Sequence, residues 1–218
     1  MSRIVLILIL LNLPITSFGQ IKFDKLYGLY SEGKDKLLSK DSDGEYYECY
    51  GDSNYKYFIS KDWKIYKLFE NNKLMVEGGI RHKSDYFEKS GPWIEYYKNG
   101  NKRAEGWYYD NAPIGLWKQY YESGGLKELY NLIKIYSDSL ANICLGGTYQ
   151  MFYENGQIRI NGNFMVKPGL DTIGIVNPEP PYQEIKTEMI LPKEFRYGNW
   201  YFYAEDGKLV DMIDYGRE

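Results

Sequence analysis

A ten-residue pattern that occurs four times is the feature of this sequence that most constrains its fold. It runs from Gly91 to Gly100, returns 24 residues later at Gly115 to Gly124, and recurs at 147–156 and 198–207. Self-similarity of this kind is the signature of repeat proteins, in which each copy packs on its neighbours. The defining residues are Gly91, Trp93, Tyr96, Tyr97 and Gly100; Gly115, Trp117, Tyr120, Tyr121 and Gly124; Gly147, Tyr149, Phe152, Tyr153 and Gly156; and Gly198, Trp200, Tyr203 and Gly207.

Each copy ends in a dipeptide that favours a tight turn. Asn99-Gly100, Ser123-Gly124, Asn155-Gly156 and Asp206-Gly207 lie between apolar runs, which is a strong sequence signal for a β-hairpin. The chain is also 17% aromatic and contains 22 glycines, a composition that favours strands and turns. We therefore predict an all-β protein, an elongated antiparallel sheet of stacked hairpins.

The turns also predict which residues face each other across a hairpin. A two-residue turn at Asn99-Gly100 places Trp93 opposite Gly106, and a large ring can then cover the glycine backbone. The second and last copies depart from this rule, so we expect those hairpins to pack differently. The remaining predicted pairs are Tyr149 with Gly162, Ile65 with Gly78, Trp117 with Tyr130, and Trp200 with Ile213.

The pattern Gly-x-Trp-x-x-Tyr-Tyr-x-x-Gly, followed by Glu105-Gly106, resembles the variant MORN repeat of bacterial YwqK-type antitoxin-like proteins. The resemblance covers 91–164 well, and 65–78 and 198–215 less well. It implies a bacterial origin and an extended run of hairpins that acts as a scaffold or binding surface. An export signal does not fit an intracellular antitoxin, so we expect no antitoxin activity.

The first residues form a separate unit. A positive start at Arg3 precedes the apolar run Ile4 to Leu13, and Pro14 ends it. This is the layout of a signal peptide, and the run is too short to span a bilayer as a helix. We predict a cleaved signal at 1–19, a cut before Gln20, no later transmembrane span, and an exported protein that is periplasmic, outer-surface or secreted.

Composition shifts divide the mature chain into four segments. We predict an N-terminal β segment or cap at 20–64, with a turn at Asp41 to Gly44 and a strand at Tyr55 to Ser60. Hairpin repeats follow at 65–164, and the residues from 26 to 33 form a further, degraded copy. The stretch from Tyr130 to Leu145 is either a strand pair or a short helix. Prolines make 165–197 a long loop, with room for short strands at 172–176 and 184–191, before the last repeat and cap at 198–218.

Two kinds of residue remain as candidates for other roles. Cys49 and Cys144 could pair in an oxidising compartment, or could be buried small side chains. The aromatic residues at repeat positions are expected to be structural. Tyrosines outside the repeat are better candidates for exposure and binding: Tyr46, Tyr47, Tyr55 and Tyr57.

Nothing in the sequence predicts catalysis. His82 is the one histidine, and no nucleophile or acid is placed beside it by a known motif. The acids at 41, 43 and 45 lack the spacing of a calcium loop, and we expect no metal, no cofactor and no enzyme activity. A formal charge of −3 with mixed signs argues against nucleic-acid binding. We expect an interaction scaffold for an unknown protein or cell-envelope component, or alternatively a carbohydrate- or envelope-binding module.

Overall fold

The computed structural model describes residues 35–49, 53–62, 64–83, 87–137, 140–176 and 184–216. The predicted signal at 1–19 and the degraded copy at 26–33 lie outside these residues. The described chain forms one open sheet of 13 antiparallel strands with no helices, as predicted, and consecutive strands are always neighbours. No helix in the described part is long and apolar enough to cross a membrane.

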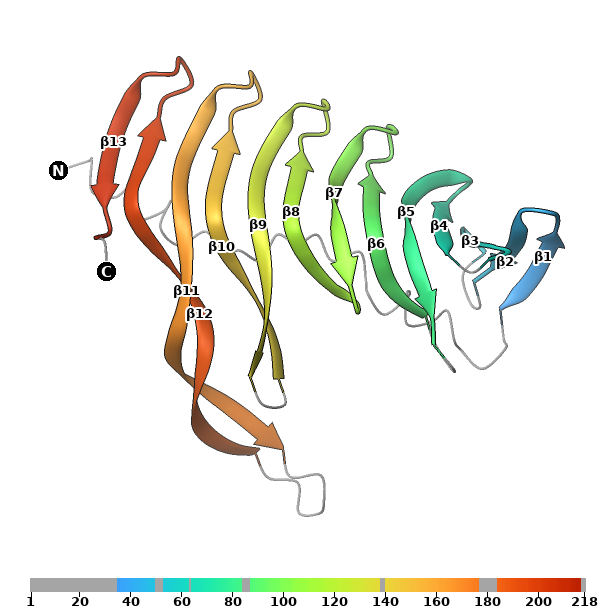
Figure 1. The fold of residues 1–218 in the computed structure, drawn as a ribbon. Coiled ribbons are helices and arrows are strands. Elements are labelled where there is room, and N and C mark those ends of the chain that lie inside the picture. The colour runs from blue at the N-terminus through green and yellow to red at the C-terminus, as the bar shows by residue number, and fades with distance from the viewer. Residues whose placement is uncertain are drawn as a thin grey trace.

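The strands stand side by side in one curved row, with the tips of the four repeat hairpins along the same edge (Figure 1). The first five are β1 (Lys36–Lys40), β2 (Gly44–Glu48), β3 (Tyr55–Ser60), β4 (Ile65–Glu70) and β5 (Lys73–His82). The repeat hairpins are β6 (Phe87–Tyr96) with β7 (Lys102–Tyr109), β8 (Ala112–Tyr120) with β9 (Leu126–Ser137), β10 (Leu140–Phe152) with β11 (Ile158–Val176), and β12 (Glu184–Tyr203) with β13 (Leu209–Asp214).

The repeat turns differ from the predicted two-residue form. At the tip of β6 and β7 the Gly100 amide donates to the Tyr97 carbonyl, and Gly100 has φ +91°. This is a turn over Lys98-Asn99 followed by a glycine in the left-handed region, the three-residue loop with a bulge. The added residue is compensated by a register shift next to Glu95, so the predicted pairing of Trp93 with Gly106 is still correct.

The other predicted register pairs are correct with one exception. Tyr149 pairs with Gly162, Trp117 with Tyr130, and Trp200 with Ile213. Ile65, however, pairs with Gly79, because a shift next to Leu68 moves the pairing by one residue. The turn between β4 and β5 is Asn71-Asn72, and both residues have positive φ, as a two-residue hairpin turn requires.

The tryptophan rings cover glycines of the preceding hairpin, so the prediction that the Trp93 ring covers Gly106 of its own hairpin is wrong. A Cβ built on Gly106 would lie 2.2 Å from Cδ2 of Trp117 on β8, and one on Gly78 would lie 1.9 Å from Cε3 of Trp93. Trp200 covers Gly162 in the same way. Each ring therefore locks its hairpin to the one before it.

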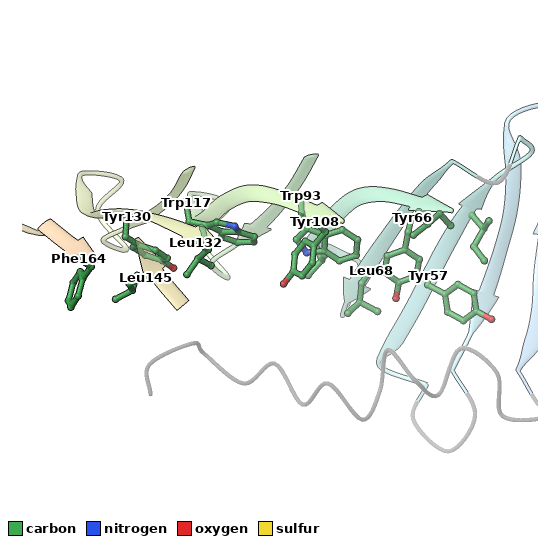
Figure 2. Close-up of a cluster of buried hydrophobic side chains, with 14 of the residues drawn as sticks. Tyr57, Tyr66, Leu68, Trp93, Tyr108, Trp117, Tyr130, Leu132, Leu145 and Phe164 are labelled. Atoms are coloured by element: carbon green, nitrogen blue, oxygen red, sulfur yellow. The ribbon is translucent and has the colours of Figure 1, made fainter. Parts of the chain in front are cut away.

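These rings belong to a core that occupies one face of the sheet. The side chains of this core face hang from the same side of the ribbon in Figure 2. The buried members are Tyr57, Ile59, Tyr66, Leu68, Val76, Ile80, Trp93, Ala104, Tyr108, Trp117, Tyr130, Leu132, Leu145, Ile160, Phe164 and Trp200.

The segment expected to be a proline-rich loop is an extended hairpin instead. β11 and β12 remain paired from Phe164 out to Val176, and Pro168 and Pro192 are register partners. Beyond Phe164, β11 no longer pairs with β10, so each strand has one neighbour. Edge strands tolerate proline because one side of the backbone needs no partner. The stretch from Tyr130 to Leu145 is a strand pair, one of the two predicted forms.

The cysteines do not form a disulfide with each other in the described chain. Cys49 follows β2 and Cys144 lies in β10, eight strands further along the sheet. That separation is roughly 38 Å at the usual strand spacing, and a disulfide requires Cα atoms within about 7 Å. Cys144 is buried, and burial raises the pKa of its thiol to about 11.

Candidate binding surface

The edge that carries the repeat turns is held together by a ladder of tyrosine hydroxyls. Tyr97 Oη donates to the Tyr120 carbonyl at 2.8 Å, and Tyr121 Oη donates to the Phe152 carbonyl at 2.7 Å. Tyr153 Oη donates to the Tyr203 carbonyl at 2.9 Å. Each bond joins one hairpin tip to the next, which explains why the repeat requires its second tyrosine.

The last copy lacks this tyrosine and has Ala204 in its place. In the described chain no hairpin follows β12 and β13, so a hydroxyl at position 204 would have no next tip to reach. The turn asparagines add a second set of bonds between tips, because Asn99 Nδ2 donates to the Glu122 carbonyl and Asn155 Nδ2 to the Glu205 carbonyl. This edge is therefore used for structure.

The first tyrosine of the repeat binds backward, on the outer face of the sheet, opposite the core face. Tyr96 Oη donates to Glu77 Oε1 at 2.5 Å, and Tyr120 Oη donates to Glu105 Oε1 at 2.6 Å. Both acids directly precede a covered glycine, Gly78 or Gly106. In the first two copies the repeat thus pairs a tyrosine with the glutamate of the preceding hairpin.

Glu105 is the centre of a larger polar group. Lys102 Nζ lies 2.7 Å and Lys118 Nζ 3.2 Å from its carboxylate oxygens. Hydrogen bonds from Lys102 first, and then from Tyr120 and Lys118, lower the pKa of Glu105 to about 2. Every oxygen of this carboxylate is engaged within the sheet, so we assign it a structural role.

An apolar area beside this polar group is exposed. Pro92, Trp107 and Ile114 are register partners across β6, β7 and β8, and therefore share the outer face. Leu116 follows Ile114 on the same face after a bulge at Gly115. Trp107 is 50% and Leu116 54% exposed. We call Pro92, Trp107, Ile114 and Leu116 the outer patch.

Charged and aromatic groups lie at one end of the outer patch. Tyr109, 47% exposed, follows Trp107 by two residues on β7. The guanidinium of Arg81 lies 5.6 Å from the Tyr109 ring centre and also bonds to Asp110 and Glu88. An apolar centre with aromatic residues and an arginine at its rim is the composition of protein interfaces.

Sequence reasoning did not single out the outer patch. Trp107 is not a repeat position, yet it follows Gly106, and strand alternation places it opposite the core face. This alternation is the sequence signal that could have identified Trp107 as an exposed residue. A large exposed ring on a rigid sheet is a better candidate for binding than a repeat tryptophan, and Trp93, Trp117 and Trp200 are all buried in the core.

The four tyrosines predicted to be exposed lie at the β2 and β3 end of the sheet. Tyr57 is 4% exposed and belongs to the core, so the prediction of its exposure is wrong. Tyr47 stacks on Tyr57 with ring centres 5.0 Å apart, and Tyr46 packs on Phe58 at 4.8 Å. Tyr46, Tyr47 and Tyr55 are half-buried. Sequence reasoning failed here because these rings pair across strands.

The structure brings together no group of three or more potential metal ligands among the described residues. His82, at the end of β5, is exposed and contacts the Phe87 ring at 5.1 Å. The acidic turn at 41–44 is closed by a side chain of its own, because the amides of Asp43 and Gly44 both donate to the Asp41 carboxylate. These groups give no arrangement on which to base a reaction.

The described strands form an open sheet of interlocked hairpins with a buried aromatic face, which is the architecture of a repeat protein. The family model of the MORN repeat variant matches residues 89–111, 113–133 and 145–165. Repeats of this family are generally non-catalytic and suggest an interaction module. Comparison with curated proteins and with solved structures found no significant match.

Proposed function

We propose that this chain is an exported, non-catalytic scaffold that binds a protein partner through the outer patch. The observation that carries the proposal is the exposure of Trp107 and Leu116 on a sheet whose repeat tryptophans, Trp93, Trp117 and Trp200, are buried. Single exposed apolar residues are common on protein surfaces, but neighbouring ones around a tryptophan mark interaction sites. The interlocked hairpins hold the patch in a fixed shape, which lowers the entropic cost of binding.

Export is part of the proposal and is supported by the sequence of residues 1–19. The charged start, the short apolar run and Pro14 favour cleavage before Gln20 and a location in the periplasm, at the outer surface or in the medium. A partner would then be a protein or another component of the cell envelope. N-terminal sequencing of the protein recovered from cell fractions tests this part, and a mature chain that begins at Met1 in the cytoplasm would refute it.

The binding proposal is tested by comparing three forms of the mature chain on immobilised beads with envelope extract. The wild type and a control variant, Leu209→Ser/Val210→Ser, should retain the same partner. The control residues are 55% and 68% exposed on β13, away from the patch. The patch variant, Trp107→Ser/Leu116→Ser, should lose that partner while its thermal unfolding stays close to that of the wild type. Retention by the patch variant would contradict the assignment.

The exposed rings of Trp107 and Tyr109 favour a second candidate, a carbohydrate-binding module, because such rings can stack on sugars. The aliphatic Leu116 and Ile114 beside Trp107 favour a protein. A glycan array with the wild type and Trp107→Ser separates the two. Glycan binding that Trp107→Ser abolishes, without a protein partner in the bead experiment, would favour the module.

A further inference from the structure

Ion pairs border the outer patch on both sides of Trp107 along β7. On one side Lys102 and Lys118 both contact Glu105, which precedes Trp107 by two residues. Lys118 is the register partner of Glu105, so both side chains lie on the outer face. These three residues form the first border group of the outer patch.

The second border group lies around Tyr109, two residues after Trp107. Arg81 pairs with Glu88 at 3.2 Å and also contacts Asp110, and Lys83 lies 3.6 Å from the same Glu88 carboxylate. A further cation reaches this group from β9, because the ammonium nitrogen of a lysine lies 6.0 Å from the centre of the Tyr109 ring. That residue is Lys134.

The cations of the two border groups extend further into solvent than the acids. The side chains of Lys102, Lys118, Arg81 and Lys83 are 41–46% exposed, whereas those of the three acids are 9–33% exposed. With Lys134 included, five cations meet three carboxylates. The border of the outer patch is therefore positive, on a chain whose formal net charge is −3.

The two border groups are separated by a distance that an extended chain can match. Glu105 and Tyr109, which mark the two groups, are four residues apart on β7, or roughly 13 Å. Trp107 lies halfway between them on the same face. In an extended partner chain, residues four apart also point the same way at this distance, and the residue midway between them shares their side.

We propose that the protein segment that binds the outer patch is extended and acidic, with an apolar residue on Trp107 and a carboxylate at each border group. The inference rests on the proposed function and names the chemistry of its partner. Each border cation can contact a second carboxylate because much of its side chain remains in solvent. Complementary charge of this kind selects partners and speeds their association.

An anionic membrane is the competing occupant for a positive border. Lipid-binding patches gather about four to eight Lys or Arg residues into one continuous positive surface. Here the sheet supplies carboxylates that offset three of the five cations, and Trp107 separates the two border groups. Single carboxylates at two separate points match this pattern better than a continuous anionic surface does.

The first test titrates three capped peptides into the mature chain and follows the indole N–H signal of Trp107 by NMR. The peptides share the core Thr-Phe-Thr and begin and end with Glu, Gln or Lys. The loss of one signal in Trp107→Phe identifies it. The Glu peptide should bind about tenfold more tightly than the Gln peptide at low ionic strength, and the Lys peptide most weakly. The preference should shrink in about 1 M salt.

Charge variants then assign this preference to the border groups. Lys83→Gln/Lys118→Gln removes one cation from each group and leaves every carboxylate there with a basic partner. This variant should lose the tenfold preference, and Lys83→Arg/Lys118→Arg should keep it. The control Lys36→Gln/Lys208→Gln has the same change in net charge at exposed lysines on β1 and the last turn, and should also keep it.

Several results would overturn this inference while the proposed function stands. These are equal affinity for all three peptides, tighter binding of the Lys peptide, or a preference that Lys83→Gln/Lys118→Gln retains. An unshifted Trp107 signal at millimolar Glu peptide would overturn it as well. Binding to phosphatidylglycerol vesicles, but to none of the peptides, would assign the border groups to a membrane. The bead experiment with Trp107→Ser/Leu116→Ser decides the proposed function separately, because it does not depend on the partner's charge.

Discussion

The indole ring of Trp117 lies on the backbone of Gly106, one hairpin before its own, and fills the space that a side chain would need. The register partner of Gly106 within its own hairpin is Trp93, whose ring covers Gly78 instead. The ring and the glycine of one repeat therefore belong to two different interfaces. This shift by one hairpin adds a side-chain contact to the backbone pairing between each of these hairpins and the one before it.

Replacing the covered glycine should destabilise the sheet. A Cβ at Gly106 would lie 2.2 Å from the Trp117 ring, so Gly106→Ala forces the indole off the strand. Overpacking of this kind costs about 1–3 kcal/mol in the free energy of unfolding. Urea unfolding followed by circular dichroism measures it. Gly125→Ala is the matched control, since its nearest contact would be an ordinary 3.5 Å, and an equal loss in both variants would contradict the assignment.

Removing a hydroxyl from the turn ladder should weaken the contact between neighbouring hairpins. Tyr121→Phe loses the bond to the Phe152 carbonyl and should lower the free energy of unfolding by about 0.5–1.5 kcal/mol. Tyr203→Phe should change it much less, because the Tyr203 hydroxyl makes no hydrogen bond within the described residues. Chemical denaturation of both variants compares them directly. If the two losses are the same, the ladder does not stabilise the sheet.

The stability of the sheet should depend on Glu105 in acid. Its pKa is about 2 in the folded chain and about 4.3 when unfolded. A lowered pKa means that the folded state favours the carboxylate, so its contribution is complete above about pH 4.3 and disappears as pH falls toward 2. Glu105→Gln should therefore be less stable than the wild type at pH 7, with a difference that shrinks at pH 3. Glu122→Gln, at an exposed turn, is the control, and a gap for Glu105→Gln that does not change with pH would contradict the role of Glu105.

The protein should keep both thiols even after passage through an oxidising compartment. Cys49 and Cys144 are too far apart in the sheet to be joined. Unfolding in N-ethylmaleimide without reductant should add two labels, read by intact mass. In the folded protein Cys144 should react more slowly than Cys49, because Cys144 is buried and its thiol pKa is raised to about 11. A disulfide-linked peptide containing both residues would contradict the strand order.

The sequence was sufficient to predict the hairpins and most of their register. Turn dipeptides such as Asn99-Gly100 mark each tip. The turn has three residues and not the predicted two, but the register shift next to Glu95 offsets the extra residue, so Trp93 still pairs with Gly106. The direction in which the Trp93 ring lies could not be predicted this way. Pairing within a hairpin says nothing about which neighbouring strand a ring covers, and that choice is made by packing between hairpins.

The candidate site was harder to predict than the fold. Trp107 lies outside the repeat pattern, and only its alternation with Tyr108 places it on the outer face. The prolines of 165–197 favoured a loop because proline is excluded from central strands, but there β11 and β12 are edges. In both cases the decisive information was which neighbours each strand has, and the sequence pattern does not specify it.

Nuclear Overhauser contacts from the Hα protons of Gly106 test the central claim most directly, because they report on the wild-type protein without any mutation. The ring of Trp117 lies over this glycine, so its indole protons should show strong contacts to Gly106, and the ring current should shift the Gly106 Hα signals upfield. Gly78 should show the same contacts to Trp93, and Gly162 to Trp200. Contacts from Gly106 to the ring of Trp93, and none to Trp117, would show that each tryptophan covers its own hairpin and would contradict the account.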